Sequence, residues 1–183
     1  MADFLWKNYF RRTSEEKEIS AILKENILFA DLSSKQLKFV THIVHLRKYR
    51  TGEVVFHQGE VGVGMYIIAS GQINITKEET ISHKSKTPNG IIITKLVPGD
   101  FFGELSLVEE NGRRSATAIA GEETSLIGFF KPDLLEILER RPSVGVKIAL
   151  RLGEVMSKRL KETTDRVSIL EEQLTLLQSP SST

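Results

Sequence analysis

Short apolar segments separated by turn residues dominate the middle of the chain. From residue 44 onwards these segments are VHLRKY, EVVFHQ, MYIIAS, INITKE, IIITKL, RSATAIA and SLIGFF, and glycine or proline follows almost every one. Segments of this length between Gly and Pro corners are typical of strands joined by tight turns. The pattern therefore predicts an all-β roll or barrel rather than alternating strands and helices.

Helical patterns flank this β region on both sides. The first 24 residues predict a helix, with Ser14 as the candidate start of a weak capping box. A second short helix is predicted in LSSKQLKFVTHI, with Ser33 or Ser34 as its N-cap. After the strands, DLLEILERR predicts a helix that Pro142 ends.

The segment from 143 to 178 predicts one long helix with an apolar seam. Steps of four and three residues separate the seam positions Met156, Leu160, Thr163, Val167, Leu170, Leu174 and Leu177, and Ala149 and Gly153 extend the register backwards. This heptad spacing favours a coiled coil, most simply a parallel homodimer through residues 149–177. The alternative is an amphipathic helix that packs on its own domain.

Length and composition bound the class of protein. We expect a helical extension at 1–24, a roll domain at 25–142, the long helix at 143–178 and a disordered tail at 179–183. The net charge of the 183 residues is +1, which does not suit a nucleic-acid binder. The chain has no cysteine, no apolar run long enough to span a bilayer and no export signal, so we expect a cytoplasmic protein.

The stretch FFGELSLVEENGRRSATAIA, residues 101–120, carries the candidate chemistry. Gly103 precedes a predicted short helix whose first amides attract an anion, and Arg114 on the returning strand offers a fork of donors for phosphate. Ser115 adds a hydroxyl, and Glu104 suits the hydroxyls of a ribose. These residues favour a nucleotide with one compact phosphate. A structural ion pair between Glu104 and an arginine is the alternative.

This stretch resembles the phosphate-binding cassette of the cyclic nucleotide-binding domain family, most closely its bacterial catabolite-activator branch. The resemblance rests on GEL and RSA in that stretch, on PGDFF before it, and on HQGE and YIIASG, and it covers about residues 25–170. It implies a jelly-roll β-roll with flanking helices, a long C-terminal dimerisation helix and cAMP as ligand, with cGMP as the alternative. No metal is implied.

The resemblance also implies a role for each matching residue. Glu104 would accept from the ribose 2′-hydroxyl, and Arg159 would brace it. The backbone of Gly103, Leu105 and Ser106, with Arg114 and Ser115, would hold the cyclic phosphate. The remaining positions would line the pocket wall (Ile75, Ile93 and Thr94) or meet the adenine (Thr163 and Thr164). Arg113, in the turn, is expected to be solvated.

Other interpretations are weaker. His42 and His45 lack partners for a metal site, and no nucleophile–base pair indicates an enzyme. After the long helix no DNA-binding module follows, so we expect no nucleic-acid binding by this chain alone. The start methionine favours a complete, stand-alone sensor with an effector partner.

Two alternatives remain open for the function: the chain would be the sensor fragment of a transcription regulator or a ligand-free structural adaptor. The aromatic N-terminus FLWKNYF would be a helix that packs on the roll or on the partner subunit, or a segment that docks on another protein or a membrane surface. The polar, basic segment 77–90 is predicted to be a long mobile loop.

Overall fold

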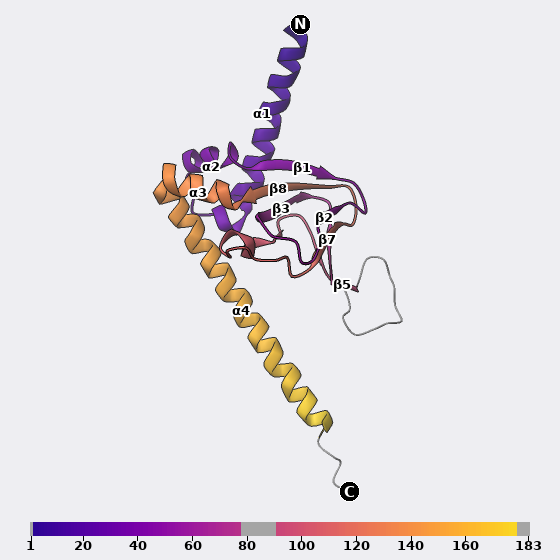
Figure 1. Ribbon diagram of the computed structural model, residues 1–183. Helices are drawn as coiled ribbons and strands as arrows, with labels where there is room; N and C mark the ends of the chain where they lie inside the picture. Colours follow the sequence, from indigo (N-terminus) through magenta and orange to yellow (C-terminus); the bar gives the residue numbers. More distant parts are fainter. Residues whose placement is uncertain (1, 78–90, 179–183) are drawn as a thin grey trace.

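Two four-stranded antiparallel sheets form the centre of the molecule (Figure 1). The computed structural model describes residues 2–77 and 91–178. The strand order is β1-β8-β3-β6 in one sheet and β2-β7-β4-β5 in the other. The strands are β1 (His45–Tyr49), β2 (Val54–Phe56), β3 (Gly64–Ser70), β4 (Ile73–Lys77), β5 (Ile91–Leu96), β6 (Phe101–Phe102), β7 (Thr117–Ala120) and β8 (Thr124–Phe130). The predicted jelly-roll fold is confirmed.

The inner strands of the first sheet, β3 and β8, are buried on both faces, which explains their continuous apolar runs. Along β3, Met65 and Ile67 face the helices, whereas Tyr66 and Ile68 face the interior between the sheets. The two-residue strand β6 divides its phenylalanines between the same two cores. Alternate side chains of a strand point to opposite faces, so a strand between two cores needs apolar residues throughout. Sequence reasoning did not identify β6 as a strand because it is so short.

Helices cover the outer face of this sheet. They are α1 (Ala2–Glu25), the 3₁₀ helix η1 (Ile27–Phe29), α2 (Ser34–Thr41), α3 (Lys131–Arg140) and α4 (Pro142–Gln178). Ser33 is the N-cap of α2 and forms a complete capping box with Gln36. Of the two predicted N-caps, Ser33 and Ser34, the structure therefore has the first. The prediction for Ser14 is wrong, because α1 runs through this position without interruption.

The first half of α4 is fixed to the body of the protein. Its apolar residues Val144, Ile148 and Leu152 lie in the core with the helices and the first sheet. Arg151 binds both carboxylate oxygens of Asp31, at 2.6 and 2.8 Å, and these hydrogen bonds lower the pKa of Asp31. This half of the helix therefore has one defined position on the roll.

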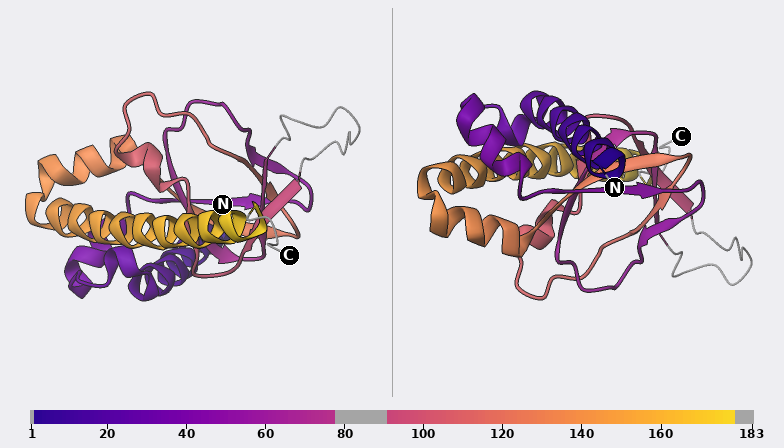
Figure 2. Two further views of the ribbon diagram at one scale, coloured as in Figure 1. Left: turned by 90° about the horizontal axis from the view of Figure 1, so that it is seen from below. Right: turned by 90° about the horizontal axis from the view of Figure 1, so that it is seen from above.

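The second half of α4 leaves the body and extends away from it (Figures 1 and 2). Its side chains from Ser157 to Leu177 are exposed. Among the predicted seam residues, exposure is 69% for Leu160, 56% for Leu170 and 86% for Leu177. The alternative in which this helix packs on its own domain is therefore wrong for this half, and the apolar seam has no partner within the described chain.

Two predicted segments, the loop at 77–90 beyond Lys77 and the tail at 179–183, lie outside the described residues. The division into a helical extension, a roll domain and a C-terminal helix stays a prediction.

The two faces of α3 give a test of this packing. Ile137 is completely buried, whereas Leu135 on the same helix is 56% exposed. Replacing Ile137 by alanine should lower the free energy of unfolding by about 2–5 kcal/mol, because a cavity remains in the core. The matched change Leu135→Ala should alter it by less than about 0.5 kcal/mol. Urea denaturation of both variants measures the difference, and equal losses would contradict the assigned burial.

Candidate functional site

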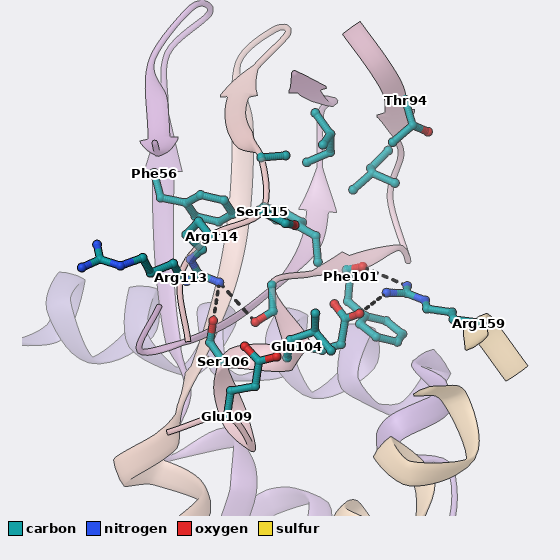
Figure 3. Close-up of a pocket in the computed structure, with 16 residues that line it drawn as sticks. Phe56, Thr94, Phe101, Glu104, Ser106, Glu109, Arg113, Arg114, Ser115 and Arg159 are labelled. Carbon is teal, nitrogen blue, oxygen red and sulfur yellow. Dashed lines mark hydrogen bonds and ion pairs between the residues drawn. The ribbon is translucent and has the colours of Figure 1, made fainter. Parts of the chain in front are cut away.

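One cavity of about 320 Å³ lies between the second sheet, the segment 101–106 and α4. Figure 3 shows the side chains that surround it. They are Phe56, Ile75, Thr94, Leu96, Phe101, Phe102, Gly103, Glu104, Leu105, Ser106, Glu109, Arg113, Arg114, Ser115, Ala116 and Arg159. Most of this wall is apolar, and the charged groups gather at the end formed by residues 103–114. A volume of this size suits a small organic ligand.

The backbone around Gly103 turns sharply from a strand into a helical turn. Gly103 follows β6 with a φ of 78°, a left-handed conformation that favours glycine, and caps the 3₁₀ helix η2 (Glu104–Leu107). A Cβ at Gly103 would lie 2.3 Å from Nη1 of Arg114. Glycine is therefore needed here both for the turn and for the close approach of the arginine.

Arg114 is buried under this turn and its guanidinium is held by three oxygen atoms. Nη1 donates to the carbonyl of Gly103 at 3.2 Å and to Oγ of Ser106 at 3.0 Å, and Nη2 donates to the carbonyl of Gly64 at 2.7 Å. The side chain is only 7% exposed. Burial lowers the pKa of the Arg114 guanidinium, because the charged form loses hydration.

Glu104 is paired with a different arginine. Its Oε1 accepts from Nη1 of Arg159 at 2.5 Å, and Nη2 of Arg159 also donates to the carbonyl of Phe101 at 3.2 Å. Glu104 is 8% exposed, whereas the side chain of Arg159 is 45% exposed. The expected contact between Arg159 and Glu104 is thus present, and it joins α4 to the cavity (Figure 3).

Both arginines lie on phenylalanine rings. The guanidinium carbon of Arg114 is 4.0 Å from the ring centroid of Phe56, and that of Arg159 is 4.6 Å from the ring centroid of Phe101. A cation over an aromatic face gains electrostatic attraction, most strongly where water is excluded. Arg114 and Arg159 are therefore each stabilised by the face of a phenylalanine ring.

The structure brings most of the predicted site residues together at this cavity. Those that line it are Ile75, Thr94, Gly103, Glu104, Leu105, Ser106, Arg114, Ser115 and Arg159. The amide of Ser106 donates to the carbonyl of Gly103 within η2, and its hydroxyl accepts from Arg114. Ser106 therefore supports the arginine in this structure. Arg113 is exposed, as expected, although it also borders the cavity.

Three predicted residues lie elsewhere. Ile93 is 58% exposed and does not line the cavity, so the expectation for it is wrong. The register explains this: Ile75 pairs with Thr94 and Thr76 with Ile92, which leaves Ile93 as the extra residue of a β-bulge.

The two predicted threonines, Thr163 and Thr164 of α4, also lie outside the cavity of the single chain. Their exposed hydroxyls donate to backbone carbonyls of the preceding turn, Thr163 to Arg159 and Thr164 to Leu160. Both follow Arg159 on the part of the helix that leaves the roll. A contact of either residue with an adenine stays a proposal.

Several lining residues were missed by sequence reasoning. Phe56, Leu96 and Phe102 read as ordinary strand residues, and Glu109 as part of an exposed turn. Gly62 was read as a loop glycine, although a Cβ there would lie 1.9 Å from Oγ of Ser106 and 3.2 Å from Nε of Arg114. The only available signal was the high glycine content of GEVGVG.

The arrangement suits an anion more than a metal ion. Arg114 and the first amides of η2 offer donors, and Glu104 offers an acceptor beside them. No group of three His, Cys, Asp or Glu residues that could hold a metal occurs within residues 2–77 and 91–178. Nor does any helix in these ranges have the length and apolar character to cross a membrane.

Fold and site together define a β-roll with a cavity, a glycine-capped turn at its edge and a helix that contacts it. The model of the family described as "Cyclic nucleotide-binding domain" matches residues 46–141. The chain belongs to this family.

Similar proteins include bacterial regulators. The chain is 31% identical over 148 residues to the cyclic AMP receptor protein of Thermus thermophilus, with 81% of this chain and 63% of that protein covered. The crystal structure of the Thermus thermophilus catabolite activator protein aligns with a TM-score of 0.67 at 29% identity, over 80% of this chain and 63% of that one. The N-terminal domain of a transcriptional regulator from Streptomyces coelicolor A3(2) aligns with a TM-score of 0.63 at 27% identity, over 80% of this chain and 94% of that one.

A side chain at position 62 should disturb the site. In Gly62→Ala, the new methyl group must displace Ser106 or Arg114, because the present distance to Oγ of Ser106 is 1.9 Å. We expect a loss of stability of about 1–3 kcal/mol, the usual cost of overpacking. The control is Gly153→Ala, where a Cβ has no neighbour within 4 Å. Thermal melting compares the two variants, and an unchanged melting temperature for Gly62→Ala would contradict the tight packing described for this loop.

Proposed function

We propose that this chain is a cAMP sensor module that dimerises through α4 and relays ligand binding through that helix to an effector protein. One observation carries the proposal: Arg114, only 7% exposed, lies at the cavity without a carboxylate partner among the described residues, while Glu104 at the same cavity is bonded to Arg159. Because a buried charge is costly unless it is paired, this cavity favours a ligand that brings a negative group to Arg114.

The two charges suit different parts of a cyclic nucleotide. The phosphate would lie against Arg114, Ser115 and the amides that open η2, where hydrogen bonds to a charged donor are strong. The ribose 2′-hydroxyl would donate to Glu104, which keeps its bond to Arg159. The apolar wall with Ile75 and Thr94 would contact the base. The name of the Thermus thermophilus relative supports cAMP, and cGMP is the alternative ligand.

The exposed seam of α4 supports a parallel homodimer. If Leu160 takes heptad position a, then Val167 and Leu174 take the next two a positions, and Leu170 and Leu177 take d. A β-branched residue at a with leucine at d favours two parallel strands, and Val167 with Leu170 is such a pair. In that arrangement Arg166 at position g faces Glu171 of the partner subunit at position e, an attractive pair.

The dimer would also bring α4 threonines to the ligand. Arg159 occupies a g position and already contacts Glu104. The facing e position on the second helix is a threonine, Thr164 of the partner subunit, while Thr163 lies in the seam one turn beyond Arg159. Both hydroxyls would then lie beside the open side of the cavity, where a base would be exposed.

The relay follows from this geometry. Arg159 is a contact between the second half of α4 and the cavity, and a ligand on Glu104 would favour the helix position in which that contact is kept. The mechanism is a population shift, in which the ligand stabilises one arrangement of helix and dimer. No step of it requires catalysis, so we propose a sensor without enzymatic activity that acts in the cytoplasm, binds no nucleic acid through these residues and has no membrane contact.

Calorimetric titration tests the ligand and its phosphate contact. Wild-type protein should bind cAMP more tightly than cGMP, and cAMP should raise its melting temperature. Arg114→Leu should weaken cAMP binding by about 1.5–3 kcal/mol, since a hydrogen bond to a charged group is lost. The control is Arg50→Leu, which removes an exposed arginine that does not line the cavity. No binding of either nucleotide by the wild type would favour a ligand-free adaptor, and unchanged affinity in Arg114→Leu would remove Arg114 from the phosphate site.

Two neighbouring residues of α4 test the dimer. Leu170 and Ile169 are 56% and 55% exposed in the single chain, but only Leu170 belongs to the seam. Sedimentation equilibrium should give a dimer for the wild type and for Ile169→Asp, and a monomer for Leu170→Asp, because a charge in the seam would be buried. A monomeric wild type, or equal behaviour of the two variants, would contradict the proposed seam.

A further inference from the structure

We propose that Phe56 is a positioning residue for Arg114, and that its ring fixes the guanidinium in the orientation that receives the ligand's phosphate. This inference rests on the proposed function and deepens it. Phe56 is the last residue of β2, and its side chain lines the cavity. Strand β2 pairs with β7, which begins a few residues after Arg114. Figure 3 shows the ring directly beside the Arg114 side chain.

The hydrogen bonds of Arg114 restrain two nitrogen atoms of its guanidinium group. The ring of Phe56 restrains the tilt of the guanidinium plane. A guanidinium is planar and has five N–H groups. The donors on one edge bind the carbonyls of Gly64 and Gly103 and the hydroxyl of Ser106. These acceptors restrain the positions of Nη1 and Nη2. The Phe56 ring, 4.0 Å from the guanidinium carbon, contacts the face of the group and restrains its rotation out of the plane.

The ring also helps to keep the arginine charged and available. No carboxylate among the described residues forms an ion pair with Arg114, because the nearby Glu104 is bonded to Arg159. The direct contacts of the buried cation are therefore neutral oxygen atoms and the aromatic face, which attracts a cation without satisfying its donors, whereas the carboxylates of Glu60 and Glu104 attract it from a distance. An anionic ligand would add a negative charge in direct contact with it. An aliphatic side chain at position 56 would fill similar space but supply no such attraction.

The aromatic cluster behind Phe56 explains why the ring is itself well placed. Its centroid is 5.8 Å from that of Phe102 and 6.2 Å from that of Tyr66, and these two rings are stacked on each other at 5.6 Å. Tyr66 in turn contacts Phe130 at 5.9 Å. Phe130 belongs to the same apolar cluster but does not line the cavity, so it provides a matched control for loss of a phenylalanine.

The test compares Phe56→Leu, Phe56→Tyr and Phe130→Leu with the wild type. Titration with cAMP should show affinity reduced roughly 3- to 30-fold in Phe56→Leu, the range expected for a desolvated cation–π contact. Phe56→Tyr and Phe130→Leu should stay within about twofold of the wild type, because both keep the ring beside Arg114. Melting temperatures of the ligand-free proteins check that all variants are folded.

An NMR signal shows whether Phe56 orients the Arg114 guanidinium or only fills space beside it. The Nη–Hη resonances of Arg114 should be resolved in the free wild type and in Phe56→Tyr, because a restrained guanidinium rotates slowly about its Nε–Cζ bond, and they should broaden or merge in Phe56→Leu. Wild-type affinity in Phe56→Leu, or an equal loss in Phe130→Leu, would overturn the inference. A wild type that binds no cyclic nucleotide would instead contradict the proposed function, and these resonances would still decide whether Phe56 holds the guanidinium.

Discussion

The burial of a guanidinium that has no carboxylate partner within residues 2–77 and 91–178 is the constraint on which this site depends. Arg114 is held by two carbonyls and a hydroxyl, and its face lies on Phe56. Burying a cation among neutral groups is unfavourable unless every contact is well made. The close approach of the backbone at Gly62 and Gly103 follows from this need, since side chains at either position would occupy the space of Arg114 or Ser106.

The rest of the fold positions this group near the carboxylate of Glu104 and near the point where α4 leaves the body. The two-residue strand β6 fixes the start of η2 between two apolar cores, so Glu104 and Arg114 reach the same cavity from opposite sides of one turn. Arg159 then ties Glu104 to α4, whose first half is fixed by the core and by Asp31 and whose second half is exposed. A ligand at the cavity therefore acts next to the point where α4 leaves the body.

The sequence predicted the architecture well because strand and heptad periods are strong local signals. The roll, the long helix and an N-cap at Ser33 or Ser34 followed from spacing and turn residues, and the structure selects Ser33. The grouping of Glu104, Arg114 and Ser115 followed from a compact motif. What could not be predicted depends on contacts distant in sequence: the bulge that turns Ile93 outward, the stack of Phe56 on Arg114, and the need for glycine at position 62. Thr163 and Thr164 matched a motif, but one chain alone does not bring them to the cavity.

The most direct test is a crystal structure of the protein grown with saturating cAMP. The account predicts the cyclic phosphate within hydrogen-bond distance of the Arg114 guanidinium and the amides of η2, and the ribose 2′-hydroxyl on the carboxylate of Glu104. Nucleotide bound at another surface, or a cavity left without nucleotide while Arg114 keeps only its present protein contacts, would contradict it.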